Sequence, residues 1–160
     1  PQPENTSLQE IVNGALAPLQ QKIRDKAIKL TSPTWPKNTA IYTDQHLLEQ
    51  VIYNLILNAI DASSKNSTIE VMLKVTPTKY TLSLLDEGCG MPFTPDPSAM
   101  SAPTTKRFGT GIGIPFAFKV CDVLASELMF EARIEGGTAV TILLPKTLNF
   151  SVDSVTELTS

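Results

Sequence analysis

The sequence predicts an α+β fold in which helices cover one face of a mixed sheet. Segments with apolar residues at helical spacing follow segments in which apolar and polar residues alternate. The expected order is a helix, two strands, a helix, two strands, a long loop, a helix and two strands. With 160 residues, 42% of them apolar, the chain is long enough for one domain with a substantial core.

The first part of the chain predicts a helix and two short strands. Apolar residues recur at helical spacing from residue 8 to 19 and beyond, and Pro18 inside this stripe is expected to kink the helix. Segments 27–31 and 39–42 are the strand candidates. The stretch 32–36 between them contains two prolines and predicts a turn.

The remaining elements are two helices and two strand pairs. Asp44 is a suitable N-cap for a helix over residues 45–63. Two alternating segments after it predict a hairpin, the next apolar segment predicts a helix, and the last two alternating segments predict a second strand pair. The corresponding ranges are 69–75 and 80–85, then 114–124, then 128–134 and 138–144.

Composition excludes several classes of protein. The net charge of -3, from 13 basic and 16 acidic residues, disfavours a general nucleic-acid binder, which needs a basic surface. No apolar run is long enough to span a membrane, and the polar first residues do not form a signal sequence. Two cysteines cannot build a disulfide scaffold, so we expect a reduced, cytoplasmic setting.

Prolines concentrate in one segment of the chain. Four of the 12 prolines lie within residues 92–108, and most of the eight glycines lie beside this segment or just beyond it. Because proline removes a hydrogen-bond donor and fixes φ, the segment is expected to be a loop. Loops of this length are usually functional lids or disordered segments.

A polar stripe runs along the expected helix 45–63. At about 100° per residue, Asn54, Asn58, Asp61 and Lys65 fall within an arc of roughly 60° if the helix extends that far. The rest of the helix is mostly apolar. Such amides are either satisfied within the protein or by solvent, or they face a ligand.

Two glycine-rich stretches are further candidates for a site. Asp86 precedes a Gly-x-Gly turn and could accept a hydrogen bond from an amino group, although a plain turn is the simpler reading. Gly109, Gly111 and Gly113 precede the expected third helix, where exposed N–H groups favour phosphate, unless they form only a flexible hinge. The stretch matches neither the P-loop nor the dinucleotide fingerprint.

Four motifs occur in order along the chain: Asn-Leu-Ile-Leu-Asn-Ala-Ile-Asp-Ala at 54–62, Asp-Glu-Gly-Cys-Gly-Met at 86–91, Thr-Thr-Lys-Arg-Phe-Gly-Thr-Gly-Ile-Gly-Ile at 104–114 and Gly-Gly-Thr at 136–138. With them the sequence resembles the ATP-binding domain of gyrase, heat-shock-90 chaperones, sensor histidine kinases and MutL proteins. It is most similar to the catalytic domain of a two-component sensor histidine kinase. The resemblance implies a Bergerat-type fold, a two-layer α/β sandwich with a mixed, mostly antiparallel sheet and three main helices on one face.

The resemblance implies a role for each residue of the polar stripe. Asn58 would ligate Mg²⁺, which takes oxygen ligands in octahedral geometry. Asn54 occupies the position of a glutamate base in ATP-hydrolysing relatives, and asparagine there suits a kinase, because activating water would waste ATP. Asp61 and Lys65 would contact the phosphates or the ribose side.

The other motifs would surround the rest of the nucleotide. Asp86 would read the adenine amino group, and Thr138 would lie near the same edge. The glycines before the third helix would wrap the phosphates, and Lys106 in the lid would lie near the γ-phosphate. Asn54 and Lys106 are the expected catalytic residues. The full set expected around Mg-ATP is Asn54, Asn58, Asp61, Lys65, Asp86, Gly88, Gly90, Met91, Thr105, Lys106, Arg107, Gly109, Thr110, Gly111, Ile112, Gly113 and Thr138.

The implied function is transfer of the γ-phosphoryl group of ATP to a histidine on a separate dimerisation and phosphoacceptor domain, with a response regulator downstream. The chain's one histidine, His46, lacks the acceptor motif and is expected only to begin a helix. The aromatic patch usual in the lid is absent from residues 97–103. Two alternatives therefore stay open: a nucleotide-binding regulatory module with weak or no kinase activity, and an ATPase switch, which Asn54 disfavours.

The expected domain organisation has three parts. Residues 1–7 would be a linker remnant, residues 8–146 the ATP-binding domain with its lid at 92–108, and residues 147–160 a polar tail. The isolated domain is expected to be a monomer without nucleic-acid binding or direct membrane insertion. A place on the cytosolic side of a membrane-bound sensor is compatible with this expectation.

Overall fold

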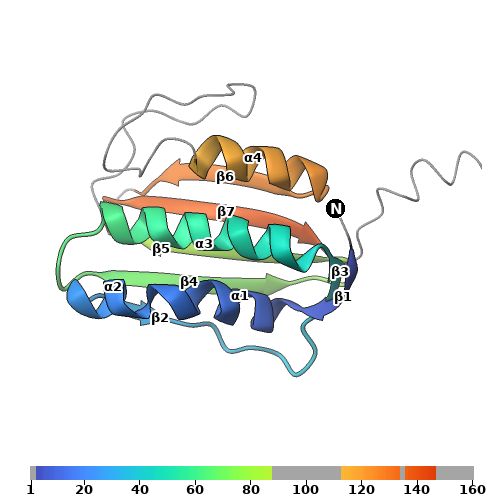
Figure 1. The fold of residues 1–160 in the computed structure, drawn as a ribbon, viewed down its shortest axis with the longest axis horizontal. Helices are drawn as coiled ribbons and strands as arrows, with labels where there is room; N and C mark the ends of the chain where they lie inside the picture. The colour runs from blue at the N-terminus through green and yellow to red at the C-terminus, as the bar shows by residue number, and fades with distance from the viewer. Residues whose placement is uncertain (1–2, 88–112, 134–135, 147–160) are drawn as a thin grey trace, which may run out of the picture.

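The computed structural model describes residues 3–87, 113–133 and 136–146 and shows helices packed on one face of a five-stranded sheet (Figure 1). The β2–β4 pair is parallel and the other described pairs are antiparallel, which confirms the predicted mixed α+β class. The sheet order is β2 (Lys29–Thr31), β4 (Thr68–Val75), β5 (Lys79–Asp86), β7 (Thr138–Pro145) and β6 (Glu127–Ala132).

The helical layer covers this sheet. Its α-helices are α1 (Leu8–Leu16), α2 (Gln20–Asp25), α3 (Gln45–Ala62) and α4 (Gly113–Val123). The long helix α3 lies between α1 and α4 and packs across β5 (Figure 1). Among the described residues, no helix is long and apolar enough to cross a membrane.

Pro18 interrupts the first helix as expected. Helix α1 ends at Leu16, a turn of 3-10 helix (Ala17–Leu19) carries Pro18, and α2 follows directly. Because proline has no N–H group, it cannot donate to the carbonyl four residues earlier, and the α-helical ladder breaks here.

The segment assigned to a linker remnant contributes a strand. Strand β1 (Glu4–Ser7) pairs antiparallel with β3 (Ala40–Thr43), and Glu4 lies opposite Thr43. Its four residues are polar, and none of them is fully buried. The strand has no buried face, and its sequence therefore shows no alternation of apolar and polar residues. This pairing adds a two-stranded sheet that the sequence did not predict.

Two predicted strands start later than expected. The segment 27–31 is extended only from Lys29, because Ala27 adopts a left-handed backbone with φ of 52° just after α2 ends. The segment 39–42 begins at Ala40 and continues to Thr43, next to Asp44, whose side chain caps α3. The two predicted strand pairs and the last helix lie within one or two residues of their expected bounds.

The core lies between the helices and the sheet. Alternate residues of β5 and β7 point into it, namely Tyr80, Leu82 and Leu84 of β5 and Val140, Ile142 and Leu144 of β7. Each buried row ends in a polar residue, Asp86 in β5 and Thr138 in β7. The alternation of strand residues therefore brings two predicted site residues into the interior at neighbouring strand ends.

Candidate functional site

The predicted site residues come from elements that meet at one end of the molecule. Figure 1 shows the end of α3, the end of β5 and the starts of β7 and α4 at this end. Helix α3 brings Asn54, Asn58 and Asp61 toward it. Asn54 and Asn58 are half-buried, whereas Asp61 is exposed. Lys65 is exposed beyond the end of α3, so it does not share the helix face that the sequence assigned to it.

The amide of Asn58 has an unpaired donor. Its Nδ2 atom is buried and makes no hydrogen bond within the part of the chain that the structure describes. Leaving such a donor unpaired costs about 1–3 kcal/mol relative to a satisfied one. A buried amide that the fold does not use is typical of a group held for a ligand.

Asp86 and Thr138 are held together in the interior. Asp86 is 3% exposed and Thr138 is 5% exposed, and the backbone N–H of Thr138 donates to Oδ1 of Asp86 at 3.3 Å. The hydrogen bond joins residues 52 positions apart because β5 and β7 are neighbours in the sheet. The structure thus joins two residues that the sequence placed at the same adenine edge.

Two further residues hold Asp86, and no pattern in the sequence predicted this role for them. Arg133 donates from Nη1 to the backbone carbonyl oxygen of Asp86 at 2.8 Å. Gly137 lies against the same carbonyl group so closely that a Cβ atom would overlap with it, and its φ of +95° is strained for other residues. The Gly-Gly pair belongs to the fourth motif of the sequence, but nothing local indicated either contact.

Lys26 holds the end of α3. Its Nζ atom donates to the carbonyl oxygens of Ile60 at 2.8 Å and Ser63 at 2.8 Å, and it lies 3.4 Å from that of Asp61. These carbonyls carry the partial negative charge of the helix end, which a lysine ammonium group stabilises. Lys26 therefore fixes the turn that follows Asn58, and no motif in the sequence indicated this contact.

Of the remaining predicted site residues, the structure describes only Gly113. Gly113 begins α4, as expected for a glycine at the start of the third helix. The rest of the set lies outside the described residues, namely Gly88, Gly90, Met91, Thr105, Lys106, Arg107, Gly109, Thr110, Gly111 and Ile112.

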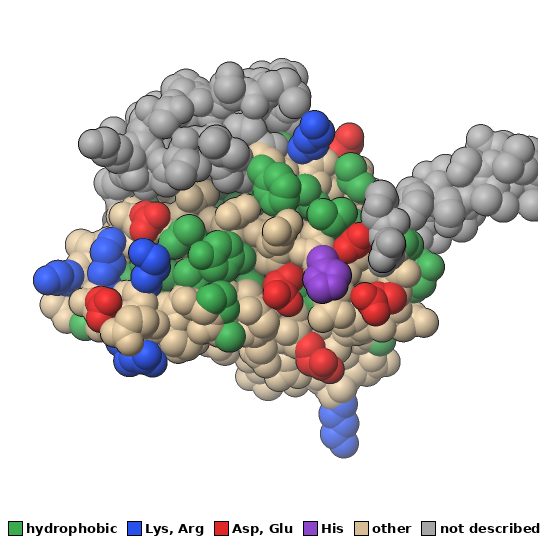
Figure 2. All heavy atoms as spheres, viewed as in Figure 1, with side chains coloured by type: hydrophobic (Ala, Val, Ile, Leu, Met, Phe, Trp, Pro, Cys, Tyr) green, Lys and Arg blue, Asp and Glu red, His purple; other side chains and the backbone are tan. Residues whose placement is uncertain are grey.

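Charges are distributed unevenly along the helical face. Acidic side chains gather around the histidine near the start of α3, and basic side chains lie near its other end (Figure 2). His46 is exposed in the first turn of α3, which agrees with the prediction that it begins a helix. The basic end is the one toward which the residues of the candidate site lie.

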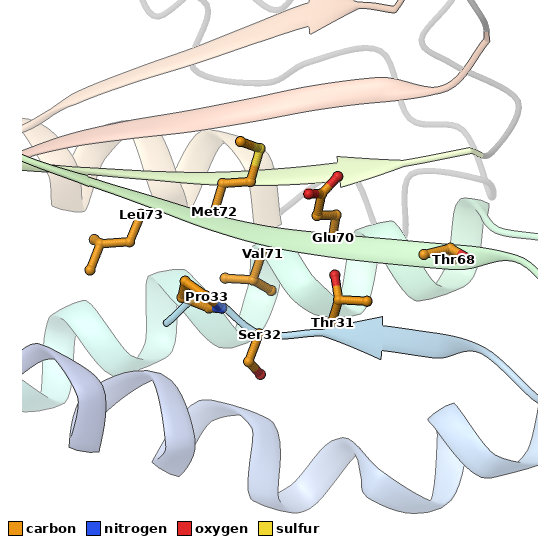
Figure 3. A pocket seen from close by; sticks show the side chains of 8 residues that line it. All are labelled: Thr31, Ser32, Pro33, Thr68, Glu70, Val71, Met72 and Leu73. Atoms are coloured by element: carbon orange, nitrogen blue, oxygen red, sulfur yellow. The ribbon is translucent and has the colours of Figure 1, made fainter. Parts of the chain in front are cut away.

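Two hollows lie on either side of the edge strand β2. One, of about 460 Å³, opens where β2 and β4 part (Figure 3), and its lining contains none of the predicted site residues. The strands part after Thr31 because Pro33 has no N–H group to continue the ladder. The other, of about 660 Å³, lies between β2 and the α1–α2 segment. Its lining also contains none of the predicted site residues.

A family model and curated relatives match the chain. Residues 43–148 match the model of the histidine kinase-, DNA gyrase B- and HSP90-like ATPases. Sporulation kinase E of Bacillus subtilis is 36% identical over 109 residues, which are 66% of this chain and 14% of that protein. Sporulation kinase A of the same organism is 26% identical over 145 residues, 89% of this chain and 24% of that protein. The chain thus spans less than a quarter of the length of these relatives.

Solved structures share the fold. The nucleotide-free catalytic domain of histidine kinase ThkA superimposes with a TM-score of 0.80 at 25% identity, covering 92% of this chain and 99% of that one. Histidine kinase ThkA in complex with the response regulator TrrA matches with a TM-score of 0.75 at 23% identity, covering 92% of this chain and 43% of that chain. The likeness agrees with the predicted Bergerat-type sandwich.

Proposed function

Because the chain belongs to the family of histidine kinase-, DNA gyrase B- and HSP90-like ATPases, we propose that it is the ATP-binding catalytic domain of a protein-histidine kinase. It would bind Mg-ATP and donate the γ-phosphoryl group to a histidine on a separate dimerisation and phosphoacceptor domain. The similarity to sporulation kinases and to the ThkA catalytic domain supports this choice within the family.

The buried pair of Asp86 and Thr138 carries the proposal. A carboxylate that is 3% exposed at the end of an apolar row is costly to bury unless hydrogen bonds compensate for it. The Thr138 N–H group orients this carboxylate. In this position the Asp86 carboxylate suits recognition of the adenine amino group, which donates hydrogen bonds.

The residues of α3 fit a magnesium ion. The buried Nδ2 donor of Asn58 has no partner among the described residues, and the oxygen of the same amide is of the kind that Mg²⁺ accepts as a ligand. Within the described residues no group of three or more His, Cys, Asp or Glu side chains is arranged so that it could hold a metal ion. Mg²⁺ is commonly held by one or two protein ligands together with water and phosphate oxygens, and Asn58 would be such a ligand. The ion would supply neutralisation of phosphate charge.

Asn54 favours phosphoryl transfer over hydrolysis. It is half-buried on α3 one turn before Asn58, and an asparagine side chain is a poor base for activating water. Phosphoryl transfer depends mainly on positioning and charge neutralisation, so the domain needs no strong base of its own. The lid expected at residues 92–108, with Lys106, would complete the site.

The same proposal implies a partner protein, a cellular location and a domain organisation. A response regulator would receive the phosphoryl group from the acceptor histidine, and the domain would work on the cytoplasmic side. Residues 8–146 would form the ATP-binding domain, and the preceding residues would lead to it from a linker. Strand β1 would then be the point where the chain enters the domain, because it is anchored on β3.

Labelling of the full-length protein tests the proposal. With γ-labelled ATP and Mg²⁺, we expect incorporation of label that survives alkali and is lost in acid, as a phosphorylated histidine requires. The matched variant Asn58→Ala should abolish it, whereas Gln50→Ala on the exposed side of α3 should not. Tight binding of Mg-ATP without any incorporation would overturn the kinase assignment.

A further inference from the structure

Arg133 directly follows β6, and β6 is not a neighbour in the sheet of β5, the strand that carries Asp86. Strand β6 pairs with β7, and β7 separates it from β5. Ala132 is the last residue of β6 and lies opposite Thr138, so Arg133 follows opposite Gly137. The side chain of Arg133 therefore crosses the start of β7 to donate to the carbonyl oxygen of Asp86, 47 residues away, at 2.8 Å.

The backbone of Arg133 is also fixed. Its N–H group donates to the carbonyl oxygen of Gly137 at 3.0 Å, and its own carbonyl accepts from the N–H of Gly136 at 3.1 Å. These two hydrogen bonds with Gly136 and Gly137 thus anchor the backbone from which the Arg133 side chain extends. Because the guanidinium group is planar and its donors have fixed directions, an anchored arginine holds its acceptor in one place.

Besides the pairing of β5 with its neighbouring strands, three described contacts bear on the position of Asp86. Arg133 holds its carbonyl oxygen, Gly137 packs against the same group, and the Thr138 N–H group meets the carboxylate. The first two fix the backbone from which the side chain extends, and the third fixes the orientation of the side chain. Arg133 is half-buried, so its hydrogen bond to the Asp86 carbonyl is partly shielded from water.

We propose that Arg133 is a positioning residue for adenine recognition: by fixing the backbone of Asp86, it holds the carboxylate where it accepts the adenine amino group. This inference rests on the proposed nucleotide site. In this role Arg133 acts through the backbone of Asp86, so its removal weakens recognition of the base more than binding of the rest of the nucleotide.

A comparison of two nucleotides tests this role. Inosine diphosphate carries a carbonyl group in place of the adenine amino group, so its 6-position accepts hydrogen bonds and offers no donor to the Asp86 carboxylate. We would titrate Mg-ADP and Mg-inosine diphosphate into the wild-type protein and into Arg133→Met, Arg133→Lys and Asp86→Asn by calorimetry. Arg24→Met is the matched control, because Arg24 is exposed on α2 and its guanidinium group donates a hydrogen bond to Gln21 of the same helix.

The expected result is a loss of selectivity. The wild-type protein should prefer ADP, Arg133→Met should lower ADP affinity about tenfold with little change for inosine diphosphate, and Arg24→Met should change neither. Arg133→Lys should retain part of the preference, because lysine keeps a donor but not the planar geometry. Arg133→Lys also supplies the comparison if Arg133→Met does not fold.

Other outcomes separate this inference from the proposed function. Equal losses for the two nucleotides, or no loss, in the Arg133 variants would overturn the positioning role. If Asp86→Asn abolishes the preference and the Arg133 variants keep it, only the inference about Arg133 fails. If the wild-type protein has no preference, or binds neither nucleotide, the adenine site itself is wrong.

Discussion

Gly137 packs directly against the backbone carbonyl group of Asp86, at a distance that leaves no room for a side chain. The contact joins the start of β7 to the end of β5. Its neighbour Gly136 has a similar backbone, with φ of +100°, but no atom lies within 4 Å of the position of its missing Cβ. A side chain at Gly136 would therefore meet backbone strain alone, whereas a side chain at Gly137 would meet backbone strain and steric overlap.

Replacement of Gly137 by alanine should damage both stability and the site. We expect Gly137→Ala to lower the unfolding free energy by about 2 kcal/mol or more, because the left-handed backbone and the overlap with Asp86 both oppose it. Gly136→Ala should lose only about 1 kcal/mol, the cost of the left-handed backbone. Urea denaturation measures both values, and equal losses would show that the overlap relaxes.

Asn58 should matter for binding and not for folding. Because its buried Nδ2 atom has no partner, we expect Asn58→Ala to leave the unfolding free energy unchanged or to raise it. The same variant should lower the affinity for Mg-ADP at least tenfold, by about 1.4 kcal/mol. Gln50→Ala, exposed on the same helix, is the control for both measurements. Unchanged affinity would argue against a ligand role for Asn58.

Lys26 should stabilise the end of α3. Lys26→Met keeps most of the aliphatic chain but removes the donor to the carbonyl oxygens of Ile60 and Ser63. We expect a loss of about 1–2 kcal/mol in the unfolding free energy. Lys22→Met, at an exposed position of α2, should be nearly neutral. A loss of the same size in both variants would point to a general charge effect.

Cys121 should be unreactive in the folded protein. It is 2% exposed, and burial raises the pKa of its thiol to about 12. We expect alkylation by iodoacetamide at pH 8 to be slow in the native protein and fast in denaturant, since the thiolate is the reactive form. The Cys89→Ser variant isolates the signal of Cys121. Rapid native labelling would contradict the burial of this side chain.

The same thiol predicts a pH dependence of stability. In the unfolded chain the thiol ionises near its ordinary pKa of 9.0, but in the folded protein it stays protonated to about pH 12. Its contribution is therefore fully present below pH 9 and is lost as the pH rises through this window. Burial also raises the pKa of Tyr80, which acts in the same direction at high pH. A Cys121→Ala variant should show a shallower decline than the parent protein between pH 9 and 11.

The sequence predicted the elements whose patterns are local. The long helix α3, the two strand pairs and the last helix follow from periodicity within each segment, and their ends follow from Asp44, Pro18 and the glycines. Asn58 stood out as part of a polar stripe on a mostly apolar helix, and Asp86 stood out because it precedes a Gly-x-Gly turn. Strand β1 could not be predicted, because its polar residues carry no alternation and its partner lies more than 30 positions away.

By itself, the sequence of this protein determined the α+β class and the order of four motifs, since helical and strand periods and turn residues act over a few positions. Only the tertiary structure decided which residues support the site. The contacts of Arg133 and Thr138 with Asp86, and of Lys26 with the end of α3, join positions 34 to 52 residues apart. Sheet order and helix packing create such contacts, and those depend on the burial of the whole core.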